Sequence, residues 1–245
     1  MKMTSMSRSK LKDKSASFLI VGAGAIGCGV AYALAKAGFQ NVTVLERESD
    51  VAKVTTAQGA GLCGQVRNSV DRVRLAMKSV ETFRELQKDS VAPPEWREVG
   101  SLRIALSEEK KAQFIHLGQV CESAGLETSW LSAEETVEKW PALSASEIVG
   151  SLWCPSDGYM TPYRVAKSYE RQCIKMGCRF VMGVEALSFL SEGNRIRGVV
   201  TQRGEYEADY TIIAAGAHAY PLALKAGVEL PATPVSTPIC HGDDS

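Results

Sequence analysis

Three glycines near the start of the chain have the spacing that holds the diphosphate of a dinucleotide. Gly22, Gly24 and Gly27 lie in F-L-I-V-G-A-G-A-I-G, directly after the apolar run of residues 17–21. The first glycine permits a tight turn, the second lets a ligand approach the backbone, and the third lets a strand and a helix pack closely. The N-terminus of the following helix would direct unpaired N–H groups and a positive dipole at the phosphates.

A carboxylate, Glu46, stands about twenty residues beyond this loop, where the dinucleotide fingerprint expects an acidic side chain. It lies in the segment V-T-V-L-E-R, whose first part is a second apolar run. A carboxylate at this place accepts hydrogen bonds from ribose hydroxyls and repels a 2′-phosphate, so NADP is disfavoured. FAD and NAD both fit the pattern, and the remaining alternative is an α/β domain without a ligand.

A strand–helix–strand unit is needed to position these residues. Apolar residues recur at helical spacing from 26 to 37 and Gly38 is a stop signal, so the sequence predicts strands over 17–21 and 41–45 with a helix between them. Further helices are predicted over residues 73–88, 107–124, 132–140 and 162–176. A loop is predicted over 57–64, and strands over 97–106, 150–154, 179–182, 185–190, 195–201, 205–208 and 210–214.

Composition argues against several other kinds of function. The 245 residues include 28 basic and 28 acidic side chains, so neither nucleic acid nor an anionic membrane surface is expected as a partner. The apolar runs are too short for a membrane span. Seven cysteines without C-x-x-C spacing and only three histidines predict reduced thiols and no metal site.

The first 14 residues are basic and rich in serine and methionine, and we expect a disordered tail there. The alternative is a short mitochondrial transit peptide. Together with the reduced cysteines, this predicts a cytoplasmic protein, with the mitochondrial matrix as the alternative location.

Motifs further along the chain distinguish FAD from NAD. They are T-T-A-Q-G-A-G-L-C-G-Q-V-R, W-R-E-V-G-S-L-R-I-A, P-S-D-G-Y-M-T-P and T-I-I-A-A-G-A-H. With the glycine loop and L-E-R, they resemble the FAD-dependent oxidoreductases of the D-amino-acid oxidase superfamily, in particular the dimethylglycine dehydrogenase, sarcosine dehydrogenase and sarcosine oxidase group. The resemblance spans nearly all of residues 17–238.

This resemblance implies a function and a cofactor. A secondary or tertiary amine, or an amino acid, would be oxidised by hydride transfer from the carbon next to nitrogen to FAD. The electron acceptor would be oxygen or an electron-transfer protein. An NAD-binding dehydrogenase and a non-catalytic remnant or subunit remain the alternatives.

Site residues are implied as well. Arg67 would help to hold a substrate carboxylate, or else is a solvated arginine at a helix start. No general base is assigned, and His218 is expected to be structural. The residues expected to bind FAD are Gly22, Gly24, Ala25, Ile26, Gly27, Glu46, Arg47, Gln58, Gly59, Ala60, Gly61, Val184, Ala215 and Gly216.

The implied fold class is α/β. A Rossmann-like FAD-binding domain with a parallel sheet would comprise residues 15–92 and 155–233, and a partial α+β substrate domain would comprise residues 93–154. Superfamily members continue further, so residues 234–245 are expected to be a truncated continuation. A truncated product, an unusual gene model or a subunit that needs a partner would each account for this, and weak, similar affinities for ADP and FAD are then expected.

The first testable prediction concerns how FAD is held. Several relatives bind flavin covalently through a histidine just before A-A-G-L, and Gln58 occupies that place. An amide cannot replace the imidazole nucleophile, so acid or heat precipitation should release all flavin into the supernatant. Flavin absorbance that stays with the washed pellet would contradict this and indicate a covalent link to another residue.

Overall fold

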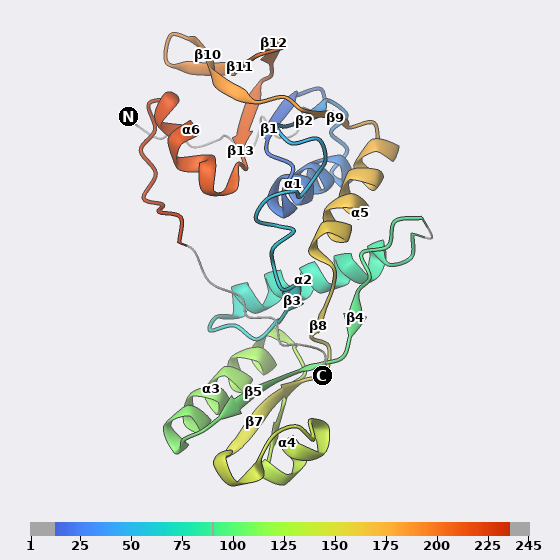
Figure 1. Ribbon diagram of the computed structural model, residues 1–245, viewed down its shortest axis with the longest axis vertical. Helices are drawn as coiled ribbons and strands as arrows, with labels where there is room; N and C mark the ends of the chain where they lie inside the picture. The colour runs from blue at the N-terminus through green and yellow to red at the C-terminus, as the bar shows by residue number, and fades with distance from the viewer. Residues whose placement is uncertain (1–12, 90, 236–245) are drawn as a thin grey trace. The chain divides into compact units, whose positions relative to one another are not determined.

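The computed structural model describes residues 13–89 and 91–235 (Figure 1). It contains two compact units: unit 1 comprises the described residues up to Ala60 and from Pro162 onward, and unit 2 comprises Gly61–Thr161. The tail expected over residues 1–14 lies outside the described residues except for its last two positions. Of the continuation expected over 234–245, only residues 234 and 235 are described. Within the described ranges, no helix is long and apolar enough to cross a bilayer.

Unit 1 is built on a four-stranded parallel sheet, which confirms the predicted Rossmann-like fold class. The strand order is β13-β1-β2-β9. Every residue of β1 is buried, as expected for a central strand with both faces covered. The strands are β1 (Phe18–Val21), β2 (Val42–Glu46), β9 (Arg179–Met182) and β13 (Tyr210–Ile213).

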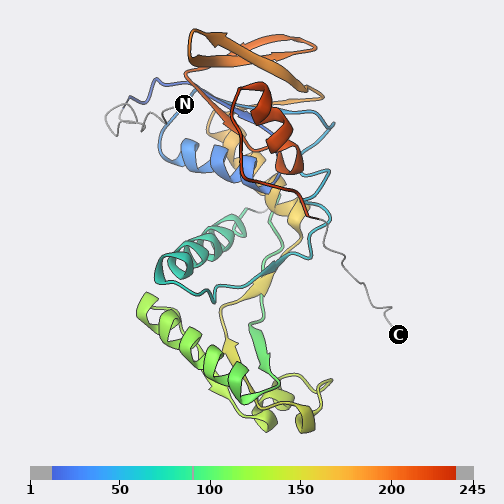
Figure 2. The same cartoon turned by 90° about the vertical axis from the view of Figure 1, so that its left-hand side faces the viewer.

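Two helices of unit 1 pack against each other beside this sheet. They are α1 (Ala25–Lys36) and α5 (Pro162–Lys175), and they lie side by side in both views (Figures 1 and 2). Each ends at a glycine with positive φ, Gly38 at 88° and Gly177 at 91°. These are the predicted stop signals, since a left-handed residue at this place closes the last turn.

An antiparallel sheet and two short helices complete unit 1. The sheet runs in the order β10-β11-β12, and β11 has the predicted bounds. The short helix α6, which was not predicted from sequence, contributes Leu222 to a core that also contains Leu19, Leu45 and Val184. The elements are β10 (Ala186–Glu192), β11 (Arg195–Thr201), β12 (Gly204–Glu207), η3 (Gly216–His218) and α6 (Ala219–Lys225).

A polar cluster fastens the loop after β2 to α5. The ammonium of Lys167 lies 2.6 Å from Asp50 Oδ1, and the hydroxyl of Tyr163 donates to Asp50 Oδ2 at 2.7 Å. Burial raises the pKa of Asp50, but hydrogen bonds from Lys167 and Tyr163 more than offset it, so the pKa lies below its usual value. The loop of residues 47–60 is therefore held by contacts with a helix more than a hundred residues away.

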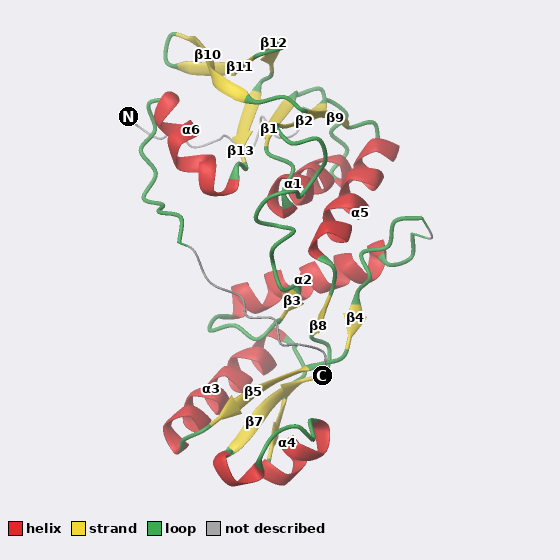
Figure 3. Ribbon diagram, viewed as in Figure 1, coloured by secondary structure: helices red, strands yellow, loops and turns green. Residues whose placement is uncertain are grey.

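Unit 2 contains two antiparallel sheets of three strands, ordered β5-β7-β6 and β3-β8-β4. Helices α3 and α4 pack against the first sheet, and α2 packs against α3 (Figure 3). The helices are α2 (Val70–Leu86), α3 (Glu108–Ala124), α4 (Ala133–Lys139) and η2 (Ala145–Glu147). The strands are β3 (Leu62–Cys63), β4 (Arg97–Glu98), β5 (Ser101–Ala105), β6 (Ser129–Leu131), β7 (Gly150–Cys154) and β8 (Gly158–Tyr159).

The predicted elements of unit 2 are mostly present, with one correction of consequence. The predicted strand over 97–106 is interrupted at Gly100, whose φ is 78° and where a Cβ would lie 1.9 Å from the ring of Trp153. The predicted capping box is present at the start of α4, where Ser132 and Glu135 bond reciprocally to each other's backbone N–H. Residues 61–92 group by contacts with unit 2. Their assignment to the FAD-binding domain, within residues 15–92, stays a prediction.

Two glycines of α1 provide a matched test of the packing around the glycine loop. A Cβ at Gly27 would lie 1.8 Å from the carbonyl oxygen of Gly22, whereas a Cβ at Gly29 would meet only Tyr169 at 3.9 Å. We expect Gly27→Ala to lower the free energy of unfolding by about 2 kcal/mol or more. Gly29→Ala should raise it by roughly 0.5–1 kcal/mol, because alanine favours the helix. Urea denaturation measures both, and equal effects would contradict the packing described.

Candidate functional site

A cavity of about 440 Å³ lies within unit 1. Its wall includes the carboxyl ends of β1 and β2 and the residues after β13, where ligands bind in open α/β sheets. The volume is in the range of small-molecule sites. Of the residues predicted from sequence, the wall contains Gly22, Gly24, Ala25, Ile26, Glu46, Arg47, Val184, Ala215 and Gly216.

The glycine loop leaves its backbone open to this cavity. Gly22 has a φ of 107°, and a Cβ there would lie 2.5 Å from the carbonyl oxygen of Ala214. Gly24 is the N-cap of α1 in extended conformation, and the first turn of the helix carries no acidic side chain. Gly27 does not line the cavity, because it is buried against Gly22. The loop thus presents the start of α1 to an anionic ligand.

Thr56 reaches the start of α1 from the loop after β2. Its hydroxyl oxygen accepts a hydrogen bond from the backbone N–H of Ala25 at 3.1 Å and also lines the cavity. A hydroxyl that accepts from an amide can still donate its own proton to a ligand oxygen. Thr56 was not predicted from sequence as a site residue, since no local pattern shows that this loop passes the start of the helix.

Glu46 points its carboxylate at the glycine loop. One oxygen accepts from the N–H of Ala23 at 2.7 Å, and the other accepts from the N–H of Glu48 at 3.0 Å. An ionised carboxylate offers about four acceptor positions, so capacity for ribose hydroxyls is left. The backbone N–H of Val184 donates to the carbonyl of Glu46 at 2.8 Å and is therefore already bonded.

Arg47 and His218 form part of the same wall and contact each other. The guanidinium of Arg47 lies 3.1 Å from Nε2 of His218 and 3.2 Å from the carboxylate of Glu48. Arginine can only donate, so Nε2 of His218 is the acceptor in this contact. This contact links the end of β2 to η3.

Other residues of the wall were not singled out from sequence. The loop after β2 adds Ala52, Lys53, Val54 and Thr55, and α6 adds Pro221, Leu222 and Lys225. Conversely, the predicted residues Gln58, Gly59 and Ala60 do not line the cavity. Gln58 and Gly59 lie in a turn, where their N–H groups donate to the carbonyls of Thr55 and Thr56. Gly61 belongs to unit 2.

Arg67 lies in unit 2 and shares a hydrogen-bond acceptor with a second arginine. Its Nη1 donates to the carbonyl of Val66 at 2.9 Å, and Nη2 of Arg103 donates to the same oxygen at 3.0 Å. Within the described residues, neither guanidinium pairs with a carboxylate. Two cations thus meet at one carbonyl oxygen. Arg103 was not singled out from sequence.

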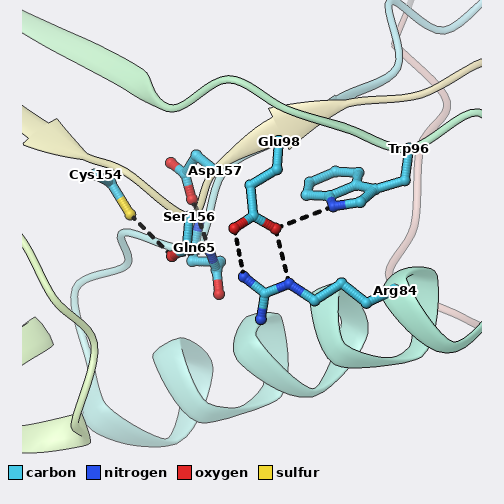
Figure 4. Close-up of polar contacts among 7 residues, drawn as sticks. All are labelled: Gln65, Arg84, Trp96, Glu98, Cys154, Ser156 and Asp157. Atoms are coloured by element: carbon cyan, nitrogen blue, oxygen red, sulfur yellow. Dashed lines mark hydrogen bonds and ion pairs between the residues drawn. The ribbon is translucent and has the colours of Figure 1, made fainter.

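A buried carboxylate, Asp157, lies near Arg67 in space, because a Cβ at Gly64 would lie 3.4 Å from its Oδ2 and 3.8 Å from Nη1 of Arg67. Asp157 accepts from the backbone and side-chain amides of Gln65 at 2.8 and 3.1 Å and from the hydroxyl of Ser101 at 2.6 Å. Figure 4 shows Gln65 next to Ser156 and Asp157, and its side-chain amide donates to both. The carboxylate therefore fixes the strand ends of unit 2.

A second polar cluster in Figure 4 also has a structural role. Glu98 receives two hydrogen bonds from the guanidinium of Arg84, at 2.7 and 2.9 Å, and one from the indole of Trp96 at 3.3 Å. Arg84, and then Trp96, hold the pKa of Glu98 below its usual value against the effect of burial. The bidentate pair ties α2 to β4.

Cys63 is not a reactive thiolate. Burial, and then the negative charge of Asp157, raise its pKa to about 11, so the thiol keeps its proton at neutral pH. In the part of the chain that the structure describes, no group of three His, Cys, Asp or Glu side chains is placed to hold a metal ion.

Comparison with known proteins places these features in a family. The chain is 28% identical over 213 residues to 4-methylaminobutanoate oxidase (formaldehyde-forming) from Paenarthrobacter nicotinovorans and 29% identical over 223 residues to human mitochondrial sarcosine dehydrogenase. It is 27% identical over 228 residues to sarcosine oxidase subunit beta from an Arthrobacter species. Among solved structures, L-proline dehydrogenase from P. horikoshii is similar, with a TM-score of 0.81 and 25% identity.

These similarities cover most of this chain but only part of each relative. They span 87% and 89% of this chain but 26% of the oxidase and 24% of the human enzyme. Coverage is 89% against 55% for the subunit beta and 87% against 56% for the proline dehydrogenase. The family described as FAD dependent oxidoreductase (DAO) matches residues 17–241. The chain therefore belongs to the FAD-dependent oxidoreductase family.

Proposed function

We propose that the chain binds FAD noncovalently, with the ADP half in the unit 1 cavity, and serves an oxidoreductase that acts on the CH–NH bond of a small amine or amino acid. One observation carries the first part of this proposal. The glycine loop, the start of α1 and the carboxylate of Glu46 all line one cavity at the carboxyl end of the parallel sheet. Family membership and the amine-oxidising relatives support the second part.

The residues present fit the ADP half of the cofactor. The open backbone of Gly22 and Gly24, the start of α1 and the hydroxyl of Thr56 would hold the diphosphate. Glu46 would accept hydrogen bonds from the adenosine ribose, and Arg47 would lie beside the adenine. When bound, the flavin supplies the hydride acceptor, and the protein supplies binding and orientation.

The paired arginines of unit 2 suit a substrate that carries a carboxylate. A carboxylate has two oxygens that accept well from guanidinium groups, and its single negative charge would offset part of the positive charge that gathers at the Val66 carbonyl. We therefore assign Arg67 and Arg103 together to this contact, which supports an N-substituted amino acid over a simple amine.

A second candidate function is that of one subunit in a larger oxidoreductase. A relative of similar identity is named as subunit beta of sarcosine oxidase. Assay of the purified chain alone and after addition of a partner would separate this from a self-sufficient enzyme. An NAD-binding dehydrogenase has less support, because the family that matches is FAD-dependent.

Titration with FAD and with ADP tests the nucleotide site through Glu46. A charged acceptor contributes about 1.5–3 kcal/mol, so Glu46→Ala should weaken binding of both ligands roughly ten- to a hundredfold. Glu46→Gln keeps one acceptor oxygen and should lose less. Glu127→Ala, at an exposed position of unit 2, is the matched control and should bind like the wild type.

Thermal unfolding of each variant establishes that the fold is kept. Unchanged affinity in a folded Glu46→Ala variant would remove Glu46 from the site. A wild-type chain that binds neither ligand would contradict the proposed nucleotide function itself.

Calorimetry with sarcosine and with its uncharged amide tests the arginine pair. Arg67→Met and Arg103→Met should each weaken sarcosine binding about tenfold and leave the amide unaffected, because only the acid offers a charged acceptor. The double variant should be little worse than either single one, since both arginines hold one group. Arg72→Met on α2 is the control. Variants that still prefer the acid over the amide as strongly as the wild type would refute the assignment.

A further inference from the structure

Lys53 is a cation in the wall of the unit 1 cavity that the contacts proposed above leave unused. Two other cations of the wall are engaged with protein groups. Arg47 contacts Glu48 and His218, and the ammonium of Lys225 donates to the carbonyl of Leu187 at 2.9 Å. Among the described residues, no hydrogen bond or ion pair involves the ammonium of Lys53. Its charge is therefore available to a ligand.

The backbone around Lys53 is anchored to the glycine loop on both sides. The N–H of Ala52 donates to the carbonyl of Ala23 at 3.0 Å, and Thr56 accepts from the N–H of Ala25 at 3.1 Å. Both anchor points lie within four residues of Lys53 in sequence. The start of this lysine's side chain is therefore fixed next to the turn that leads into α1.

Backbone strain at Ala52 supports the same conclusion. Ala52 has a φ of 56° and is buried, and a left-handed conformation costs a residue with a Cβ about 1–2 kcal/mol. Strain of this kind is kept where the surrounding contacts impose it, and it concentrates at ligand sites. The left-handed conformation of Ala52 changes the direction of the chain directly before Lys53.

The charges of the cavity wall indicate a role for the Lys53 ammonium in binding an anionic ligand. A dinucleotide brings two negative charges on its diphosphate, and the start of α1 offers only about half a positive charge. Glu46 and Glu185 in the same wall are negative. An unpaired ammonium beside the glycine loop would offset this excess.

We propose that Lys53 is the cationic contact for the diphosphate of the bound nucleotide. The inference rests on the proposed function, because it assumes that an adenine nucleotide occupies this cavity. The ammonium would donate charge-assisted hydrogen bonds to phosphate oxygens. The adenosine part would depend on Glu46 and not on Lys53.

Calorimetric titration of the full chain with ADP and with adenosine tests this. Lys53→Met should weaken ADP binding about tenfold, because a charged contact is lost, and should leave adenosine binding unchanged. Lys53→Arg keeps the charge and should restore most of the ADP affinity.

Lys88→Met removes an exposed lysine of unit 2 and should bind both ligands like the wild type. Added salt should weaken ADP binding less in Lys53→Met than in the wild type, because the variant lacks the attraction between the lysine and the diphosphate that salt would screen.

The possible outcomes separate this inference from the proposed function. Equal ADP affinity of the wild type and Lys53→Met overturns the role of Lys53 and leaves the nucleotide site standing. Equal losses for ADP and adenosine also overturn it, because they indicate that the lysine only maintains the loop. A wild type that binds neither ligand overturns the proposed function and the inference together.

Discussion

The turn from β1 into α1 is possible only because two of its residues lack a side chain. The space where a Cβ of Gly27 would lie is taken by the carbonyl of Gly22, and the corresponding space at Gly22 is taken by the backbone of Ala214. This contact brings helix, strand and the end of β13 together at one point. The open end of α1, the carboxylate of Glu46 and the loop with Thr56 are all placed relative to it.

A second constraint operates on the loop after β2. Asp50 is held by Lys167 and Tyr163 from α5, and Ala52 is bonded to the glycine loop in a strained conformation. The cavity wall on this side therefore depends on contacts between segments that are far apart in the sequence. Local sequence patterns cannot report such contacts.

This explains what could be predicted from the sequence and what could not. The glycine loop, Glu46 and the capping box of α4 have local patterns. The structure confirms the capping box and puts Gly22, Gly24 and Glu46 in one cavity wall, while their contacts with FAD stay a prediction. No local pattern predicts that Thr56 and Lys53 line the cavity, because their positions depend on the path of the loop after β2. The three strands β3, β6 and β8 have two or three residues each, which is too short for periodicity to show.

In unit 2, the arginine pair also depends on contacts between segments that are far apart in the sequence. The carboxylate of Asp157 accepts three hydrogen bonds from Gln65 and Ser101, and among the described residues it forms no ion pair with Arg67 or Arg103. The two guanidiniums converge on one carbonyl because strand β5 passes beside the segment that follows β3. Arg67 was predicted from a motif, whereas Arg103 emerged only from the spatial arrangement.

The central claim is that the cavity of unit 1 receives the ADP half of FAD, and backbone amides report on it most directly. The measurement is a titration of ¹⁵N-labelled protein with ADP, followed by the amide signals of the whole chain. The largest saturable shifts should fall on Gly22, Gly24 and Ala25 and on the loop around Thr56. No saturable shift, or shifts confined to residues outside the cavity wall, would contradict the claim.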